Sequence, residues 1–239
     1  MQPDITTLHQ WYQEPLGQTC AEIIRQRLLE IAPNFTGERL LILGYAEPYL
    51  NLWPQEQVVW GMPAAMGGYA WPDEKNCRSA LVDTEALPFA DQTFDGILLL
   101  HALEYNTCDE TLLNECYRVL YPAGRLLVVT PNRLGVWARR EKTPWASGTP
   151  YSSGQLRKLV SNKGFRTVSI QHGLFVPPME SAFIQKRAQL WEKVGRKCAS
   201  AMGGVVLLEA SKDVLGGHII RVRQNKRMLP PIVRPVATG

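Results

Sequence analysis

Residues 81–133 constrain the fold of this chain more than any other stretch. They contain a helical pattern that begins at Asp109 between two apolar runs, Phe94–Leu100 and Arg125–Thr130, the second of which follows a turn at 122–124. Short apolar runs bounded by turn residues are typical of strands buried on both faces. The helical pattern places five apolar residues on one face: Leu112, Leu113, Cys116, Val119 and Leu120. This strand–helix–strand order predicts parallel pairing of the two strands.

The rest of the chain continues the alternation of strands and helices. Further strands are expected at Arg39–Gly44, Gln57–Gly61, Ser79–Val82, Phe165–His172 and Gly203–Ala210. Helices are expected over 5–31 with a break at Pro15, over 152–164 from a capping box at Ser152 and Gln155, and over Glu180–Cys198. The alternation predicts an α/β fold with a mostly parallel sheet that helices cover on both faces.

Length and composition fit one soluble α/β domain. The 239 residues are 45% apolar and 20% charged, which is enough to bury a sizeable core. The sequence has no run of 18 apolar residues and no basic region followed by an apolar one at its start, so neither a membrane span nor a secretory signal is expected. Five scattered cysteines without Cys-x-x-Cys pairs favour reduced thiols in a cytoplasmic protein over disulfides or a metal site.

The charge of the chain is uneven along its length. Residues 214–239 contain five basic residues, no acidic ones and three prolines, within a net charge of +4 for the whole chain. Such a segment can contact nucleic acid or an anionic surface, although a solvated end is the simpler interpretation. We therefore expect a helical cap at 1–36, an α/β domain at 37–211 and a basic tail at 212–239.

The order of motifs in residues 81–133 resembles that of the class I S-adenosylmethionine-dependent methyltransferases, in particular the methyltransferase type 11 group. The features that carry the resemblance are an acid after the third strand, Leu87-Pro88-Phe89, and His-Ala-Leu-Glu after the fourth strand. The wider chain is similar to a bacterial subgroup whose glycine-rich loop is degenerate, through WYQEPLG, LGYAEPYL, PNRLGVWARR, TPYS and VPP between residues 11 and 211. The resemblance implies a Rossmann-like, seven-stranded sheet with its last strand antiparallel, and S-adenosylmethionine as cofactor.

The loop after the first strand is where the resemblance implies contacts with the cofactor. The family has an acid near the strand end and glycines at alternating positions of the loop, which let the backbone approach the cofactor. Here Gly44 matches the first glycine, Tyr45 follows it, and Ala46 and Pro48 take the places of the next two glycines. Ile42 stands where the acid would be. We expect Gly44 to face solvent at the pocket, so that Gly44→Arg abolishes cofactor binding without unfolding the chain.

Two further loops are implied as cofactor contacts. The second strand of the family ends in an acid that binds both ribose hydroxyls, but Met62 and Pro63 occupy this position here. Asp83 follows the third strand, with Thr84 and Glu85, where the family contacts the adenine amino group. Asp83 can instead be a solvated residue that caps the turn.

The end of the fourth strand carries two titratable residues. His101 lies where the family backbone faces the methionine part of the cofactor, and it can be a base or a hydrogen-bonded structural residue. Glu104 is expected to orient a neighbouring helix or to pair with Arg118 rather than to act as an acid or base.

Substrate contacts are expected from the long segment after the fifth strand and from the N-terminal helix. The segment holds Asn132, Arg133, Trp137 and Tyr151, and arginine beside aromatic rings suits a planar or anionic partner. Trp137 can equally be a core residue of a short helix. Tyr12 can fold over the mouth of the ligand site or pack in the core.

Two functions remain open from the sequence. The first is a methyltransferase for a small molecule or an exposed macromolecular group, an in-line displacement that depends on positioning more than on an activated base. The second is a methyltransferase-fold protein that has lost catalysis and acts as a binding or regulatory module, which the residues at Ile42, Met62 and Pro63 favour. A nicotinamide-dependent oxidoreductase is disfavoured because the full Gly-x-Gly-x-x-Gly turn is missing.

Overall fold

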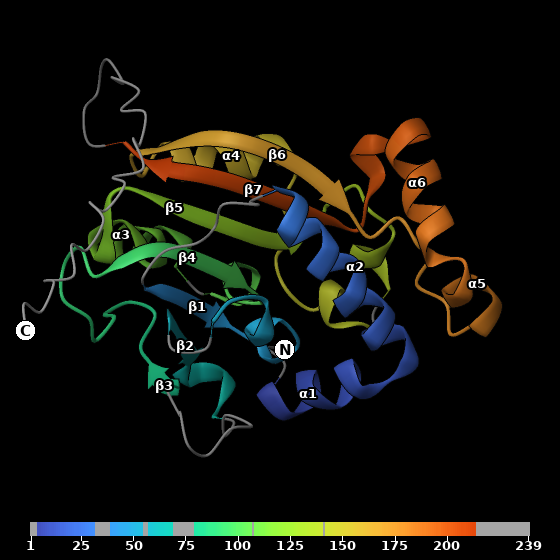
Figure 1. Ribbon diagram of the computed structural model, residues 1–239, viewed down its shortest axis with the longest axis horizontal. Coiled ribbons are helices and arrows are strands. Elements are labelled where there is room, and N and C mark those ends of the chain that lie inside the picture. The colour runs from blue at the N-terminus through green and yellow to red at the C-terminus, as the bar shows by residue number, and fades with distance from the viewer. Residues whose placement is uncertain are drawn as a thin grey trace, which may run out of the picture.

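A single seven-stranded sheet organises the chain in the computed structural model, which describes residues 4–31, 39–54, 57–68, 79–106, 108–140 and 142–213. The strand order is β3-β2-β1-β4-β5-β7-β6. The strands are β1 (Leu40–Gly44), β2 (Val58–Pro63), β3 (Ser79–Val82), β4 (Phe94–Leu100), β5 (Leu120–Pro131), β6 (Phe165–Gly173) and β7 (Val205–Lys212). Only β7 runs antiparallel to its neighbours, so the predicted Rossmann-like class I methyltransferase architecture is confirmed (Figure 1).

Helices cover both faces of this sheet. They are α1 (Ile5–Gln13), α2 (Pro15–Ile31), α3 (Asp109–Val119), α4 (Ser153–Ser161), α5 (Ala182–Lys186) and α6 (Ala188–Cys198). Alternate residues of β4 face opposite sides, as the period of a strand requires. Leu98 joins a core cluster with α1 and α2, whereas Leu99 joins a second cluster with α3 and α4. This burial on both faces explains why β4 reads as a continuous apolar run.

The helix starts follow from local capping chemistry. Asp4 caps α1, because its side chain accepts the backbone N–H of Thr6 at 3.0 Å. Ser152 and Gln155 form the predicted capping box at the start of α4. The predicted break at Pro15 is confirmed, because α1 ends at Gln13 and α2 begins at Pro15, whose missing N–H favours a first helical position. The predicted boundary at residue 36 and residues 214–239 of the basic tail lie outside the described residues.

Two expected elements differ in the structure, and one element was not predicted. Residues 122–124 do not form a turn before the fifth strand. Instead β5 begins at Leu120, and its register with β4 shifts between Phe94 and Gly96, as in a β-bulge. The helix expected over Glu180–Cys198 is broken at Arg187 into α5 and α6. Between β1 and β2, the described residues form a 3-10 helix at Glu47–Leu52 rather than an α-helix.

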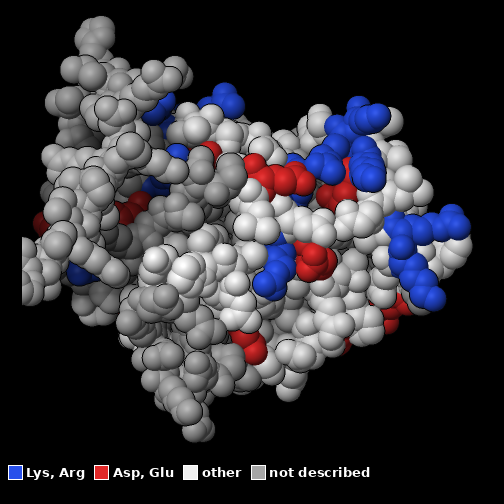
Figure 2. Space-filling model, in the orientation of Figure 1, with Lys and Arg blue, Asp and Glu red and all other residues white. Residues whose placement is uncertain are grey.

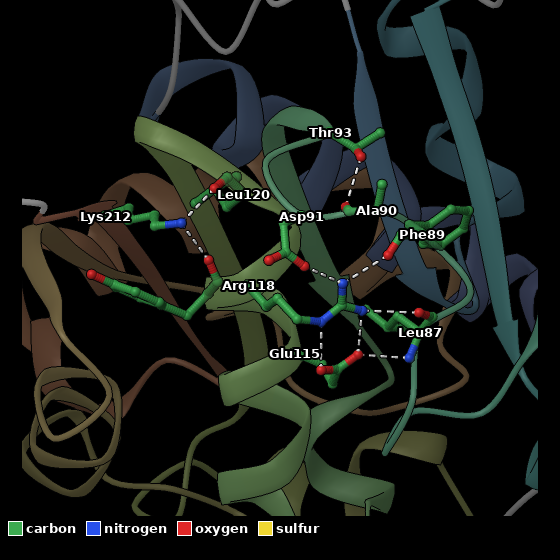
Figure 3. Close-up of polar contacts among 10 residues, drawn as sticks. Leu87, Phe89, Ala90, Asp91, Thr93, Glu115, Arg118, Leu120 and Lys212 are labelled. Carbon is green, nitrogen blue, oxygen red and sulfur yellow. Dashed lines mark hydrogen bonds and ion pairs between the residues drawn. The ribbon is translucent and has the colours of Figure 1, made fainter.

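Arg118 of α3 fixes the segment that contains the Leu-Pro-Phe motif. Its guanidinium donates to both carboxylate oxygens of Glu115, at 2.8 and 2.7 Å, and to the carbonyl oxygens of Leu87 and Phe89, at 3.0 and 2.8 Å. Glu115 in turn accepts the N–H of Leu87 at 2.8 Å (Figure 3). Arg118 therefore ties the loop between β3 and β4 to α3, and this part of the motif serves the fold.

Candidate functional site

The candidate site lies at the carboxyl ends of the parallel strands. The strand order reverses between β1 and β4, and ligands of doubly wound sheets bind at such a switch point. The arrowheads of β1, β4 and β5 point to the same side of the molecule (Figure 1). Gly44, Met62, Asp83 and His101 end or follow β1, β2, β3 and β4. The fold therefore brings the predicted cofactor residues to one edge of the sheet.

One half of this edge is open. A cavity of about 220 Å³ is lined by Pro63, Ala65, Met66, Asp83, Thr84, Glu85, Ala102, Tyr105 and Asn106, and we call it the β3 cavity. The Asp83 carboxylate is exposed and accepts the N–H of Glu85 at 2.8 Å. The Thr84 hydroxyl donates to Asn106 Oδ1 at 2.9 Å. Asp83, Thr84 and Glu85 thus lie together around one hollow.

The other half is filled by side chains of the protein itself. Tyr12 of α1 lies between the ends of β1 and β4, in a space that we call the β1–β4 crevice. Its hydroxyl is 2.8 Å from His101 Nε2, and its ring stacks on that of Tyr45 with centroids 5.3 Å apart. His101 Nδ1 in turn lies 3.1 Å from Glu104 Oε1. All four side chains are buried.

Further aromatic rings surround the β1–β4 crevice. Trp145 lies against His101 with ring centroids 4.1 Å apart, and the indole N–H of Trp60 donates to the carbonyl oxygen of Gly44 at 2.7 Å. Burial raises the pKa of Tyr12 and of Tyr49, so both phenols stay neutral. The crevice is consequently an uncharged aromatic cluster around the His101–Glu104 pair.

Two buried polar atoms beside His101 lack a hydrogen-bond partner among the described residues. They are Glu104 Oε2 and Trp145 Nε1. An unsatisfied buried acceptor or donor costs about 1–3 kcal/mol, so such atoms mark a place where a partner belongs. The expected pairing of Glu104 with Arg118 is wrong, because Glu104 contacts His101 while Arg118 binds Glu115 and Asp91.

Gly44 does not face solvent, which corrects the expectation for this position. It is buried with φ of +100°, and a Cβ on it would lie 2.0 Å from the carbonyl oxygen of Leu100. The glycine is therefore required for close packing of β1 against the end of β4. Ala46 is buried as well, and the carboxylate of Glu47 accepts the hydroxyl of Tyr45 at 2.7 Å. The expectation that Gly44→Arg leaves the fold intact is wrong.

Among the described residues, the end of β2 offers no charged group to a ligand. Met62 is buried and Pro63 lines the β3 cavity, so a thioether and ring carbons occupy the place where the family has an acid. A ribose bound there would lack the two charge-assisted hydrogen bonds that a carboxylate provides.

Two residues that were expected at the substrate site have structural contacts. Asn132 is buried and donates to the carbonyl oxygens of Ala201 and Gly203 at 2.9 and 2.7 Å. Trp137 is fully buried, and its indole N–H donates to the carbonyl oxygen of Val176 at 2.8 Å. Of the two interpretations left open for Trp137, the structure shows the core residue.

The other expected substrate residues are divided between two places. Tyr12 lies in the β1–β4 crevice, whereas Arg133 and Tyr151 line a separate cavity of about 290 Å³ together with Asp109 and Lys158. The Tyr151 hydroxyl donates to Asp109, and partial burial raises the pKa of that carboxyl. The aromatic residues Tyr49 and Trp60 were not predicted at the site, because only the tertiary packing brings them there.

Part of the chain matches a known family. A family model described as a methyltransferase domain matches residues 65–128, from just after β2 into β5. The ubiquinone/menaquinone biosynthesis C-methyltransferase UbiE of Klebsiella pneumoniae is 48% identical over 54 residues, which is 23% of this chain and 22% of that protein. UbiE of Roseobacter denitrificans is 30% identical over 131 residues, which is 53% of this chain and 51% of that protein. The chain thus spans about half or less of the length of these relatives.

Solved structures share the architecture. A methyltransferase from Thermotoga maritima, described as S-adenosylmethionine-dependent and as a possible histamine N-methyltransferase, superposes with a TM-score of 0.60. The superposition covers 86% of this chain and 94% of that chain at 18% identity. At this identity the likeness shows the fold and leaves the chemistry to the residues of the site.

Proposed function

We propose, since this chain belongs to the class I S-adenosylmethionine-dependent methyltransferase family, that it transfers the methyl group of S-adenosylmethionine to a small molecule or an exposed macromolecular group. The observation that carries the proposal is the β3 cavity. All of its lining residues except Pro63 lie in the family-matched stretch, and the exposed Asp83 carboxylate lies at its rim. When bound, the cofactor would supply an activated methyl group for in-line displacement, and the protein would position the acceptor. A cytoplasmic location remains part of this proposal.

The described conformation fits only part of this cofactor. The β3 cavity, at about 220 Å³, is smaller than the roughly 300–1,000 Å³ of pockets that enclose drug-sized ligands. It suits the adenine end, which Asp83 and Thr84 would hold by hydrogen bonds. The ribose and methionine parts would extend toward the β1–β4 crevice, where the ring of Tyr12 now lies. We infer that Tyr12 withdraws when the whole cofactor binds.

If only the Tyr12 side chain moves, the free energy that this costs is smaller than the binding free energy of the cofactor. Exposing one large ring costs about 1.5–3 kcal/mol, and losing its hydrogen bond about 0.5–1.5 kcal/mol. A ligand with a micromolar Kd gains about 8 kcal/mol on binding. Displacing all of α1 would also expose Ile5, Leu8 and Trp11, at a total of about 6–12 kcal/mol. Rotation of the Tyr12 side chain is therefore favoured over release of the helix.

Glu104 is the residue best placed to replace the acid that Ile42 does not provide. Its Oε2 atom is buried beside the crevice and lacks a partner among the described residues, and Trp145 Nε1 is an unsatisfied donor nearby. We propose that Glu104 holds the amino group of the cofactor once Tyr12 withdraws. His101 would orient the Glu104 carboxylate through its 3.1 Å contact.

Calorimetric titration with S-adenosylmethionine and with its demethylated product tests the proposal. We expect micromolar binding to the unaltered chain. In Asp83→Ala, loss of a hydrogen bond to a charged group should weaken binding by about 1.5–3 kcal/mol. Asp91→Ala is the matched control, because that carboxylate is exposed and does not line the β3 cavity. No heat and no thermal shift up to millimolar ligand would contradict the proposal.

A binding or regulatory module without catalysis is the second candidate. The side chains of Tyr12 and Tyr45 in the crevice, together with Met62 at the ribose position, favour it. This candidate predicts no binding of the intact cofactor even after Tyr12 is truncated. If the protein does transfer a methyl group, the molecule that accepts it is not identified by the described residues. The 131-residue match to UbiE covers about half of each chain, so the acceptor of that relative is not transferred to this one.

A further inference from the structure

The helices α5 and α6 expose an apolar surface at the side of the molecule toward which β6 points (Figure 1). The sequence pattern over Glu180–Cys198 would normally place its apolar residues in a core. Instead, large apolar side chains in and beside these helices are exposed: Met179 at 51%, Phe183 at 64%, Leu190 at 55%, Trp191 at 41%, Val194 at 46% and Met202 at 56%. We call this set the α5–α6 surface.

The apolar residues of α6 are exposed because of the way this helix is attached to the segment after β6. The carboxylate of Glu192 is buried and accepts the backbone N–H groups of Phe175 and Val176. Ala188 is buried on the same side of the helix, one turn before Glu192. Because successive residues turn by about 100° around a helix, Leu190 and Val194 lie on an outward arc. An apolar face thus points away from the protein while a carboxylate anchors the inner face.

Cationic side chains flank the α5–α6 surface. Lys186, Lys193 and Lys197 are exposed and have no ion-pair partner within the described part of the chain. The guanidinium of Arg187 lies 4.3 Å from the centroid of the Phe183 ring. Figure 2 shows Lys and Arg side chains gathered over the protruding end that α5 and α6 form. Cations therefore outnumber the exposed acid Glu180, which follows Met179, at the border of the apolar surface.

We propose that the α5–α6 surface docks on an anionic membrane. Helices that lie in a membrane interface combine Trp, Phe and Leu on one arc with Lys and Arg on another, and each cation near an anionic bilayer adds to binding. None of the helices in the described residues is long and apolar enough to cross a membrane, so the contact is peripheral.

Other partners fit the α5–α6 surface less well. In a two-fold pairing with a second copy, each surface meets itself, so the lysines that border it would face like charges. Nucleic acid would engage the cations through its phosphates but would leave Phe183, Leu190 and Trp191 exposed to water. A membrane satisfies both the apolar arc and the charges.

Docking would also orient the candidate site. The strand β6 runs parallel to β1 and β4, because β7 is antiparallel to both β5 and β6. The helices α5 and α6 follow β6, so they lie at the edge of the sheet that carries the β3 cavity and the β1–β4 crevice. Membrane docking would bring this edge close to the bilayer surface. The inference does not depend on methyl transfer.

Cosedimentation with vesicles tests the inference. The full chain should bind vesicles that contain phosphatidylglycerol, bind phosphatidylcholine vesicles weakly, and dissociate as salt screens the charges. The double variant Phe183→Ser/Leu190→Ser should lower the partition coefficient by about tenfold or more. Lys186→Glu/Lys193→Glu should remove the preference for anionic vesicles.

Matched controls separate the surface from general effects. Leu81→Ser removes an equally exposed leucine, at 56%, from β3, which is the outermost strand on the side of the sheet away from β6. Arg157→Glu/Lys158→Glu changes the net charge by the same amount on α4. Both controls should bind vesicles like the unaltered chain, with thermal unfolding used to verify folding. Residues 214–239 are unchanged in all variants, so binding through that segment alone would persist in every one.

Three results would overturn the inference. The first is an absence of binding to anionic vesicles, and the second is binding that the Phe183→Ser/Leu190→Ser variant retains in full. The third is a concentration-dependent dimer, seen by analytical ultracentrifugation, that this variant abolishes while vesicle binding is unchanged. The last outcome would assign the surface to self-association.

Discussion

The β3 cavity and the β1–β4 crevice lie on the same edge of one sheet but differ in what occupies them. The cavity is open and has exposed carboxylates, Asp83 and Glu85, at its rim. The crevice is filled by the rings of Tyr12 and Tyr45 and by the buried His101. All the lining residues of the cavity except Pro63 lie in the stretch that matches the methyltransferase domain, whereas Tyr12 and Tyr45 of the crevice lie outside that stretch.

The departures in the first loop are consistent with one another. Ile42 is fully buried in the same core cluster as Tyr12 and Tyr45. A carboxylate at this position would have to be desolvated, at a cost of several kcal/mol. The change from acid to Ile42 and the presence of Tyr45 therefore suit a crevice packed with rings. Substitutions in the filled crevice should remove buried packing and lower the free energy of unfolding. Substitutions at the open cavity should change fewer packing contacts and affect stability less.

The largest effect is expected at Gly44. In Gly44→Ala the new Cβ would lie 2.0 Å from the Leu100 carbonyl oxygen, and φ of +100° is unfavourable for alanine. Overpacking and backbone strain together should lower the free energy of unfolding by about 3–5 kcal/mol, measured by urea denaturation. Gly154→Ala in α4 is the control, because no atom lies within 4 Å of the position that its Cβ would take. It should be neutral or stabilising, and an equally mild effect at Gly44 would refute close packing there.

Truncation of Tyr12 should alter ligand affinity as well as stability. In Tyr12→Ala the crevice is vacated, so S-adenosylmethionine no longer has to displace the ring and should bind about tenfold tighter or more. The free energy of unfolding should fall by about 3–5 kcal/mol, as for other buried aromatic residues. Calorimetry and urea denaturation measure the two effects.

Tyr12→Phe is the matched control for the crevice. It keeps the ring and removes only the hydroxyl that contacts His101. We expect no gain of affinity in this variant. If Tyr12→Ala binds no more tightly than Tyr12→Phe, the crevice is not part of the cofactor site. If neither variant binds the cofactor, the second candidate function is favoured.

A smaller effect is expected at Arg118, which holds the loop between β3 and β4 and does not line the β3 cavity. Arg118→Ala leaves the carbonyl oxygens of Leu87 and Phe89 and the carboxylate of Glu115 without their donor. The free energy of unfolding should fall by about 2–3 kcal/mol in urea denaturation. Asp91→Ala should cost less than about 1 kcal/mol, because its side chain is 72% exposed. Equal losses in the two variants would show that the Arg118 contacts with the loop contribute little.

The sheet could be predicted from the sequence, but the surface of its last helices could not. The alternation of apolar runs and helical patterns was sufficient to predict the sheet, because the spacing of apolar residues within a short segment indicates whether that segment is a buried strand or a helix. The break of the last long helix at Arg187 and the exposure of Phe183 were not predictable, since both depend on how α6 sits on the loop at Phe175. A helical stripe alone does not say whether anything covers it.

The candidate site was predictable only where it is local in sequence. Asp83, Thr84 and Glu85 follow one strand directly, so their common cavity could be expected from the motif. Tyr12 reaches His101 from 89 residues away in the chain, and no spacing rule links the two. Tertiary packing of α1 decides whether the crevice is open, and this information is absent from any short stretch of sequence.

The smallest effect concerns pH. Partial burial raises the pKa of Asp109 above its ordinary value, so the folded state binds this proton more tightly than the unfolded state. Its contribution to stability therefore falls as pH rises from the ordinary value of about 3.9 through the raised folded value. Asp109→Asn should remove this fall when melting temperature is followed against pH.

Glu110 gives the control with the opposite sign. Its pKa is lowered by the hydrogen bond from Lys163, so its contribution to stability is present above the ordinary carboxyl pKa and is lost as pH falls through the lowered one. Glu110→Gln should thus change the acid side of the profile in the direction opposite to Asp109→Asn. Tyr12→Phe should leave the profile unchanged over this range, because burial keeps the Tyr12 phenol neutral. A profile that shifts with Tyr12→Phe would show that the filled crevice titrates, and not only Asp109 in its separate cavity.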